Sequence, residues 1–448
     1  MRRIHVALVG ASALALFSTL NASAWQIRKA ASLACVGDYD IAYTKDAAQP
    51  MNAPEIVTWV CSPSPSAITK IIIPASWGGR YARLSANLKE LDGAAVMADI
   101  IKNDASFLGS PRKLGNSASD YIALNINSAI VPVVAGDYFE VRVPYGTGVP
   151  NIGGNLYSWF TAEKKAAAFD GALVYKSATQ LAPASTDTTL TWDLESYDLN
   201  TWHDNVTNNS RLTVPAGVSL VRIQANTHTT TSNISNYCQF TFKNGAGAYG
   251  LPGGCSDTPS TAAIGLVSSI LAVSPGDYFT TYINSNKAGG TTVENANFTW
   301  FQIEAIPATR KYALVQRTSS QAIAADTPTI INWNAETADT DGFHDNATNS
   351  SRLTVPAGMS KVRLSGNVRI GTLVAQTVIK LLKNGADVSG GFQDGTTTVG
   401  VQRNNGFSAI LDVTPGDYFE MEITQSSGGN IDTSFSSWFS IEEVTDPG

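Results

Sequence analysis

The clearest pattern along the chain is a strict alternation of apolar and polar positions in short runs. In the run from Tyr418 to Ile423, the apolar residues Phe419, Met421 and Ile423 alternate with residues that are polar or charged. Successive side chains of a β-strand point to opposite faces, so this run predicts a strand with one face in a core. Helical periodicity is nearly absent, and the pattern therefore predicts an all-β protein.

Short turn motifs separate these runs. The run that begins at Ser351 ends at Pro356-Ala357-Gly358, and the run that ends at Lys383 continues into Asn384-Gly385, a strong hairpin signal. The segments at residues 361–365 and 378–382 also alternate and are expected to be two further strands. About eight short strands in a segment of about 135 residues are typical of a sandwich or jelly roll that buries its own core.

One set of landmarks occurs three times. Blocks of Gly-Asp-Tyr-Phe begin at Gly136, Gly276 and Gly416, 140 residues apart. A Trp, a Pro, a Lys before Asn and a Trp before Phe recur with them, at Trp59, Trp192 and Trp333, Pro74, Pro215 and Pro356, Lys102, Lys243 and Lys383, and Trp159, Trp300 and Trp438. This spacing exceeds that of solenoid repeats, so each copy is expected to be a domain. The sequence predicts three tandem antiparallel jelly-roll β-sandwich domains, at residues 25–165, 171–306 and 311–448.

The N-terminal segment has the three regions of a cleaved secretory signal. Arg2-Arg3 precedes an apolar run over residues 6–20, and Ala22-Ser23-Ala24 offers a cleavage site. An uncleaved anchor is the alternative, but a bilayer needs about 20 apolar residues. We therefore expect residues 1–24 to be a signal peptide, the mature chain to be secreted, and no membrane insertion.

Composition narrows the choice of partners. Charged residues make up 15% of the chain, the net charge is −7, and no basic cluster is present. Nucleic acid requires a positive surface, so it is not an expected partner. The composition does not exclude sugars or proteins as partners.

Four cysteines fall in two pairs, one in each of the first two repeats. In an oxidising compartment they are expected to form two disulfides, with three connectivities open. Pairing within repeats, Cys35 with Cys61 and Cys238 with Cys255, requires no crossing between domains. The third repeat has no cysteine, so the fold does not depend on these bonds.

Repeats two and three resemble a known family. The stretches that carry the likeness are Trp202-His203-Asp204-Asn205, the run from Arg211 to Gly217, Phe242-Lys243-Asn244-Gly245, the run from Leu271 to Phe279 and Phe298-Thr299-Trp300-Phe301, with the same order from Phe343 to Phe439. They are similar to the complement C1q-like domain of the tumour-necrosis-factor-like jelly-roll superfamily. Repeat one is diverged, with Cys61-Ser62-Pro63 where the His-Asp-Asn loop would lie.

The resemblance implies domains that form tight trimers, bind macromolecules and catalyse nothing. Three tandem copies could pack as one pseudo-trimer within the chain or trimerise between chains. The linkers from Glu163 to Ala172 and from Ile306 to Tyr312 span at most about 30 and 20 Å. Such short linkers and the effective concentration of tethered copies favour the pseudo-trimer.

The search for chemistry finds no nucleophile elbow, zinc-protease helix or phosphate loop, so no enzyme is expected. His203-Asp204 and His344-Asp345 lack a third catalytic group and more simply order a loop. The oxygen-rich positions of the same loops, Asp198, Asn200 and Asp204 with Asp339, Asp341 and Asp345, are candidate calcium ligands. The alternative is that these residues make turns.

Repeated arginines and aromatic residues have two interpretations each. Arg83, Arg222 and Arg363 share one slot, and Arg211 and Arg352 share another; both slots suit structural ion pairs or, alternatively, recognition of a glycan or carboxylate. The first Trp of each repeat could be an exposed sugar platform but is more simply a packing anchor. The Tyr of each Gly-Asp-Tyr-Phe block is expected to face the trimer axis, at Tyr138, Tyr278 and Tyr418.

The expected function is that of a secreted, non-enzymatic binding or adhesion protein that recognises a glycan or a protein surface through its loops. The alternative is a structural protein, such as a virion fibre or decoration protein or a component of an extracellular matrix.

Overall fold

The chain forms three tandem antiparallel jelly-roll β-sandwiches, and the strand pairs all join strands of the same repeat. The computed structural model describes residues 40–45, 49–51, 55–60, 67–91, 96–115, 122–146, 151–154, 156–232, 234–258, 262–426, 429–431 and 437–445. These residues contain no α-helix, only strands and two 3-10 turns. The all-β prediction is therefore confirmed, while the predicted signal peptide at residues 1–24 lies outside the described residues.

The first jelly roll has two sheets. Its elements are β1 (Asp40–Thr44), β2 (Gln49–Pro50), β3 (Glu55–Ile56), β4 (Trp59–Val60), β5 (Ala67–Ile68), β6 (Lys70–Ile72), η1 (Ala75–Trp77), β7 (Arg80–Glu90), β8 (Val96–Lys102), β9 (Arg112–Gly115), β10 (Ile122–Asn127), β11 (Val131–Val133), β12 (Tyr138–Gly146), β13 (Asn151–Ile152) and β14 (Trp159–Lys164). One sheet has the order β2-β13-β7-β14-β1-β4-β5, with β10 and β11 on β7. The other has the order β3-β12-β8-β9, with β6 on β12.

The second jelly roll repeats this plan. Its elements are β15 (Gly171–Tyr175), β16 (Gln180–Ala182), β17 (Thr188–Thr189), β18 (Leu194–Asp198), β19 (Arg211–Thr213), β20 (Leu220–His228), β21 (Ile234–Lys243), β22 (Gly253–Thr258), β23 (Ala263–Val267), β24 (Leu271–Ala272), β25 (Tyr278–Asn284), β26 (Thr291–Val293), η2 (Ala296–Phe298) and β27 (Trp300–Ala305). One sheet has the order β18-β15-β27-β20-β23, with β24 on β20. The facing sheet has the order β17-β25-β21-β22, with β19 on β25, and β16 pairs with β26.

The third jelly roll joins its two sheets through one long strand. Its elements are β28 (Tyr312–Gln316), β29 (Gln321–Ile323), β30 (Thr329–Ile330), β31 (Ala335–Asp339), β32 (Leu353–Thr354), β33 (Lys361–Lys383), β34 (Ala386–Asp387), β35 (Gln393–Phe407), β36 (Leu411–Asp412), β37 (Tyr418–Gln425), β38 (Gly429–Ile431) and β39 (Trp438–Glu443). Both segments predicted as strands, at residues 361–365 and 378–382, lie in β33, so they form one long strand and not two. This strand pairs first with β39 and then with β37, and its register against β35 shifts between Ile370 and Leu373.

Each sandwich encloses its own apolar core, built from the alternating positions of its strands. In β37, which contains the alternating run from Tyr418 to Ile423, the side chains of Phe419, Met421 and Ile423 are fully buried in the core of the third jelly roll. The first core also takes in Leu173 and Trp300 from the second repeat. The cores are therefore separate but in contact.

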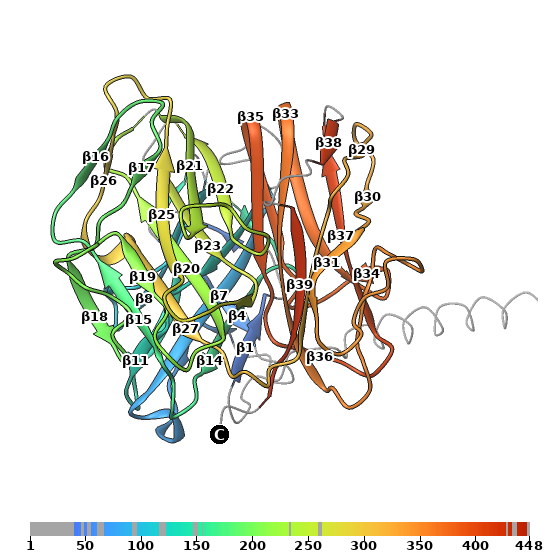
Figure 1. Cartoon of the computed structure of the whole chain (residues 1–448), viewed down its shortest axis with the longest axis horizontal. Coiled ribbons are helices and arrows are strands. Elements are labelled where there is room, and N and C mark those ends of the chain that lie inside the picture. Colours follow the sequence, from blue (N-terminus) through green and yellow to red (C-terminus); the bar gives the residue numbers. More distant parts are fainter. Residues whose placement is uncertain are drawn as a thin grey trace, which may run out of the picture.

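The three jelly rolls meet along β10 of the first, β22 and β23 of the second and β35 of the third. Figure 1 shows the second jelly roll, in green and yellow, beside the third, in orange and red, with β22 and β35 at their boundary. The strand β35 also lies against β10 of the first jelly roll, and β10 lies against β23. Within the described residues, no helix is long and apolar enough to cross a membrane.

Candidate functional site

The most distinctive polar cluster lies where the three jelly rolls meet. Each contributes an arginine and a glutamate that face each other on paired neighbouring strands. These pairs are Arg83 with Glu163, Arg222 with Glu304, and Arg363 with Glu442. All three arginine side chains are at most 5% exposed. We call these six residues the axial ring.

Ion pairs link the ring in cyclic order. Within each jelly roll the closest N···O distances are 3.3 Å for Arg83 and Glu163, 2.9 Å for Arg222 and Glu304, and 3.1 Å for Arg363 and Glu442. Between jelly rolls, Arg83 pairs with Glu304, Arg222 with Glu442 at 2.5 Å, and Arg363 with Glu163 at 2.6 Å. Each glutamate thus joins two jelly rolls, and the cycle closes after three.

The arginines keep the ring glutamates ionised. Burial alone would raise the pKa of Glu163, but the charges of Arg363, Lys165 and Arg83 hold it well below its usual range. The pKa of Glu304 is lowered in the same way against burial, mainly by Arg83 and Lys165. The ion-pair interpretation of this arginine slot is therefore confirmed.

One phenylalanine fills the space between the three arginines. The guanidinium carbons of Arg83, Arg222 and Arg363 lie 5.5, 5.5 and 5.1 Å from the centre of the Phe407 ring. The corresponding positions of the first two repeats are Asn127 and Val267. The third repeat alone therefore contributes an aromatic ring at this point.

A second cycle of contacts uses the closing tryptophans. Each indole Nε1–H donates to a backbone carbonyl of a neighbouring jelly roll: Trp159 to Gly391 at 2.6 Å, Trp300 to Ser110 at 2.9 Å, and Trp438 to Leu251 at 2.9 Å. These indoles are fully buried. They run in the same cyclic order as the ion pairs, so two independent sets of contacts define the arrangement.

Sequence reasoning missed the glutamates and the role of these tryptophans, although a signal was present. An acidic residue follows the closing Trp by four positions in every repeat, at Glu163, Glu304 and Glu442. A repeated arginine slot together with a repeated acidic slot is the pattern of a cyclic ion-pair network.

The predicted calcium ligands lie at the ends of β18 and β31 and in the loops that follow, where the four aspartates Asp198, Asp204, Asp339 and Asp345 accept backbone N–H groups. Asp198 accepts from Trp202 and His203 at 3.0 Å each. Asp204 accepts from Val206 at 2.8 Å and from Thr207 at 2.9 Å, and these bonds lower its pKa. Asn200 donates to Asp170 at 3.0 Å.

The third repeat has the same loop. Asp339 accepts from Phe343 at 3.0 Å and from His344 at 2.9 Å. Asp345 accepts from Ala347 at 2.8 Å, and Asp341 pairs with Lys311 at 3.0 Å. Over the part of the chain that the structure describes, no three His, Cys, Asp or Glu residues are grouped to hold a metal. Calcium stays a prediction, which a fall in the melting temperature on adding a chelator would support.

The loop histidines brace these loops. The His203 ring contacts Glu195 Oε1 at 3.0 Å through Nδ1 and the Asn209 carbonyl at 3.3 Å through Nε2. His344 repeats both contacts with Glu336 and Ser350. Both rings are buried, so the geometry supports the interpretation that they order the loop.

The aromatic landmarks divide between the core and the outer sheet. Trp59, Trp192 and Trp333 are at most 1% exposed, which confirms packing anchors. The prediction that Tyr278 faces the axis was wrong. It lies on β25, in the sheet that faces away from the axial ring, where the Arg211 guanidinium stacks 4.4 Å from its centre. Arg352 stacks on Tyr418 and Lys70 on Tyr138 in the same way.

The repeated Lys-Asn and Gly-Asp-Tyr-Phe motifs form a hydrogen-bonded clasp. In the second repeat, Asp277 accepts from Lys243 at 2.8 Å, from the Asn244 side chain at 2.7 Å and from the Ser274 amide at 2.8 Å. Asn244 in turn accepts from the Tyr278 amide at 2.9 Å. Burial alone would raise the pKa of Asp277, but the bonds from Lys243, Ser274 and Asn244 lower it to about 2. The other repeats have the same clasp around Asp137 and Asp417.

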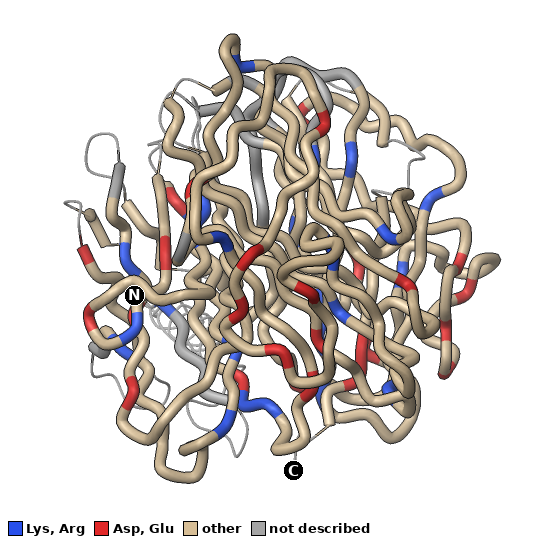
Figure 2. Tube along the Cα trace, turned by 60° about the vertical axis from the view of Figure 1, so that its left-hand side comes forward, with Lys and Arg blue, Asp and Glu red and all other residues tan. Residues whose placement is uncertain are grey.

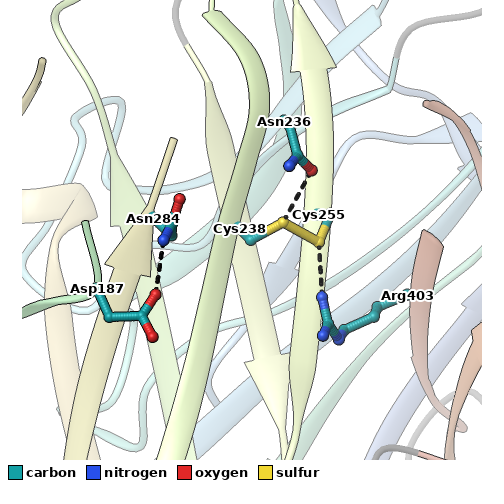
Figure 3. The surroundings of a disulfide bond; sticks show 6 residues. All are labelled: Asp187, Asn236, Cys238, Cys255, Asn284 and Arg403. Atoms are coloured by element: carbon teal, nitrogen blue, oxygen red, sulfur yellow. Dashed lines mark hydrogen bonds between the residues drawn. A yellow bond between two sulfur atoms is a disulfide. The ribbon is translucent and has the colours of Figure 1, made fainter. Parts of the chain in front are cut away.

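One of the two predicted disulfides can be followed in the structure. Cys238 on β21 and Cys255 on β22 lie opposite each other and are joined by a disulfide (Figure 3). Figure 3 also shows Arg403 of the third jelly roll beside Cys255, with Nη1 donating to Sγ at 3.2 Å. Cys35 and Cys61 lie outside the described residues.

Comparison with known proteins gives little. No protein-family model and no curated protein matches the chain. One similar solved structure is described as showing the triple jelly roll fold and turret assembly in an archaeal virus. It has 9% identity and covers 90% of this chain and 89% of that chain with a TM-score of 0.20. Another is from Sulfolobus Turreted Icosahedral Virus, at 8% identity, covering 92% and 96% with a TM-score of 0.19. Identities and TM-scores this low assign neither a family nor a function to this chain.

Proposed function

We propose that the chain is a non-enzymatic structural protein that works as a single-chain pseudo-trimer, a rigid block of a larger exported or virion-borne assembly. The axial ring carries this proposal. Each jelly roll gives an arginine to the glutamate of its neighbour, and the third closes on the first. Because these contacts close within one chain, they bury the faces through which separate chains would otherwise trimerise.

The tryptophan cycle and the first linker support the same assembly. Phe169, in the linker between the first two jelly rolls, packs against Tyr81 of the first at 4.9 Å and Tyr197 of the second at 5.9 Å between ring centres. A linker that is itself packed holds both neighbours in one orientation. Rigidity of this kind suits a building block better than it suits beads on a string.

The mixed distribution of basic and acidic residues along the backbone agrees with a structural role. Figure 2 shows basic and acidic residues interspersed along the described chain. The buried ring arginines and glutamates pair between jelly rolls, and the loop histidines and aspartates brace loops. The polar groups therefore hold the fold together.

Light scattering on the purified chain tests the pseudo-trimer. We expect the mass of one chain, near 47.4 kDa less any cleaved segment, and a mass near three chains would contradict the proposal. Electron microscopy of the source's extracellular particles, labelled with an antibody against the chain, tests the structural role. Label in a regular array supports that role, whereas label confined to free protein would overturn it.

A binding or adhesion role is the second candidate, favoured by one observation. The braced loops of the second and third jelly rolls present small exposed segments, and Val206 at the tip of the first of them is 89% exposed. A rigid loop with an exposed apolar tip is a suitable contact for a glycan or protein surface. A glycan array run with and without calcium tests this role, and retention on a defined glycan that is lost in Val206→Asp would support it.

A further inference from the structure

A cavity of about 210 Å³ opens beside the axial ring, at the end of the molecule where both linkers run. Its walls come from all three jelly rolls and include Glu163, Glu304 and Glu442 together with Arg222 and Arg363. A water molecule takes about 30 Å³ of liquid volume, so the cavity has room for a small ion with several waters.

Positive charge exceeds negative charge in this buried cluster. The three ring arginines balance the three ring glutamates, but Lys165 adds a fourth cation, 3.1 Å from Glu163 and 2.9 Å from Glu304. Its equivalents in the other repeats are the apolar residues Ile306 and Val444. The extra charge is therefore a special feature of the first repeat and is not needed for the fold.

Arg310 adds a further cation to the cavity wall. Its Nη1 donates to the Glu443 carbonyl at 2.8 Å and to Thr445 Oγ1 at 3.0 Å, so its contacts are with neutral acceptors. Lys164 lines the same wall. The cations that line the cavity thus outnumber its three glutamates.

Two guanidinium groups at the cavity have hydrogen-bond donors with no acceptor among the described residues. They are the Nε–H groups of Arg222, whose side chain is 3% exposed, and of Arg310. An unpaired buried donor costs about 1 to 3 kcal/mol relative to a paired one. These buried Nε–H groups do not face the open cavity, but the positive charge of both guanidinium groups favours an anion beside them.

We propose that this cavity is a binding site for a small oxyanion, a phosphate or sulfate group, held by Lys165, Arg222 and Arg310. Guanidinium groups bind the oxygens of such anions through paired N–H donors, and an ammonium group adds a point charge. A cation is a poor fit, because each ring glutamate is already paired with arginines of two jelly rolls. The anion would neutralise the extra charge and tie the linker end of the assembly together.

Burial supports this assignment. Desolvation and the nearby charge of Arg83 lower the pKa of Lys165, although Glu163 and Glu304 oppose the shift. A cation that is buried at a cost is stabilised by an added negative charge. The site is contained in one chain and goes beyond the proposed structural role, because it does not depend on any larger assembly.

Titration calorimetry and thermal unfolding of the full chain in inorganic phosphate, against chloride at equal ionic strength, test the proposal. We expect one phosphate to bind per chain and to raise the melting temperature. Lys165→Ile, which copies the second repeat, should weaken phosphate binding by at least about tenfold, since one charge-assisted contact is worth about 1.5 to 3 kcal/mol. Arg310→Gln should also weaken it. Lys287→Gln, in the loop between β25 and β26, is the charge-matched control and should not.

The variants also separate binding from stability. In chloride, Lys165→Ile should be as stable as the parent chain or more so, because the cation in excess over the ring glutamates is gone and each of those glutamates keeps two arginines. If that variant does not fold, the phosphate affinity of Arg310→Gln is compared with that of the parent chain instead. Absence of phosphate binding by the parent chain, or equal affinity in Arg310→Gln and the parent, would overturn the proposal. Repeating the titration with glycerol phosphate distinguishes a free ion from a phosphate ester, and binding of either supports the site.

Discussion

At the scale of single residues, the most repeated motif of the chain is explained by hydrogen bonds and not by a ligand. The Lys, Asn and Asp of each repeat close one clasp between a hairpin and the turn before Tyr138, Tyr278 or Tyr418. The clasp asparagines adopt positive φ, 53° at Asn244, a conformation in which Asn is well tolerated. The sequence showed that these residues belong together, but their spacing alone did not show which atoms meet.

The clasp makes a residue-scale prediction for Asp277. Replacing it by Ala should lower the free energy of unfolding by about 1 to 3 kcal/mol, because Lys243, Asn244 and the Ser274 amide lose their acceptor. Asp326→Asn, at an exposed turn residue with positive φ, is the control and should change it by less than about 0.5 kcal/mol. Denaturant unfolding measures both, and equal stability of the two variants would contradict the clasp.

At the scale of elements, the sequence predicted strands well and their partners poorly. Alternation located the strand β37 and its buried face, and Asn-Gly located the turn after β33. The alternation did not distinguish the roles of two tryptophans. The Trp192 ring packs in the core of the second jelly roll, whereas the Trp300 indole donates a hydrogen bond to another jelly roll. Both positions are apolar and β-rich, and the difference is set by which strand end faces the neighbour.

These two tryptophans give a matched pair of variants. Trp300→Phe removes the Nε1 donor and leaves the buried Ser110 carbonyl without it. Trp192→Phe removes a buried Nε1–H that has no acceptor among the described residues. We expect Trp300→Phe to cost about 1 to 3 kcal/mol more than Trp192→Phe in denaturant unfolding. The reverse order would show that the indole contact does not hold the jelly rolls together.

At the scale of the whole molecule, the axial ring should make stability depend on acid. The pKa values of Glu163, Glu304 and Glu442 are lowered in the folded chain. Their contribution is complete above the unfolded pKa, near 4.3, and is lost as the pH falls through the lower folded values. The urea midpoint should therefore drop steeply below about pH 4, and 1 M salt at neutral pH should change it little, because the ring is buried. An unchanged midpoint at about pH 3 would contradict this.

The assembly itself should depend strongly on Glu304, since this carboxylate is shared by Arg83, Arg222 and Lys165. Glu304→Gln keeps the size of the side chain but takes one of two carboxylate partners from each of three buried cations. Breaking a buried ion pair costs about 3 to 5 kcal/mol. Asp341→Asn also removes one carboxylate from an ion pair, but its partner Lys311 is 42% exposed, so the cost should be within about 1 kcal/mol. Unfolding midpoints measure the difference, and small-angle scattering shows whether the jelly rolls of Glu304→Gln separate before they unfold. If both variants cost the same, the cyclic ion pairs are not what holds the three jelly rolls in one block.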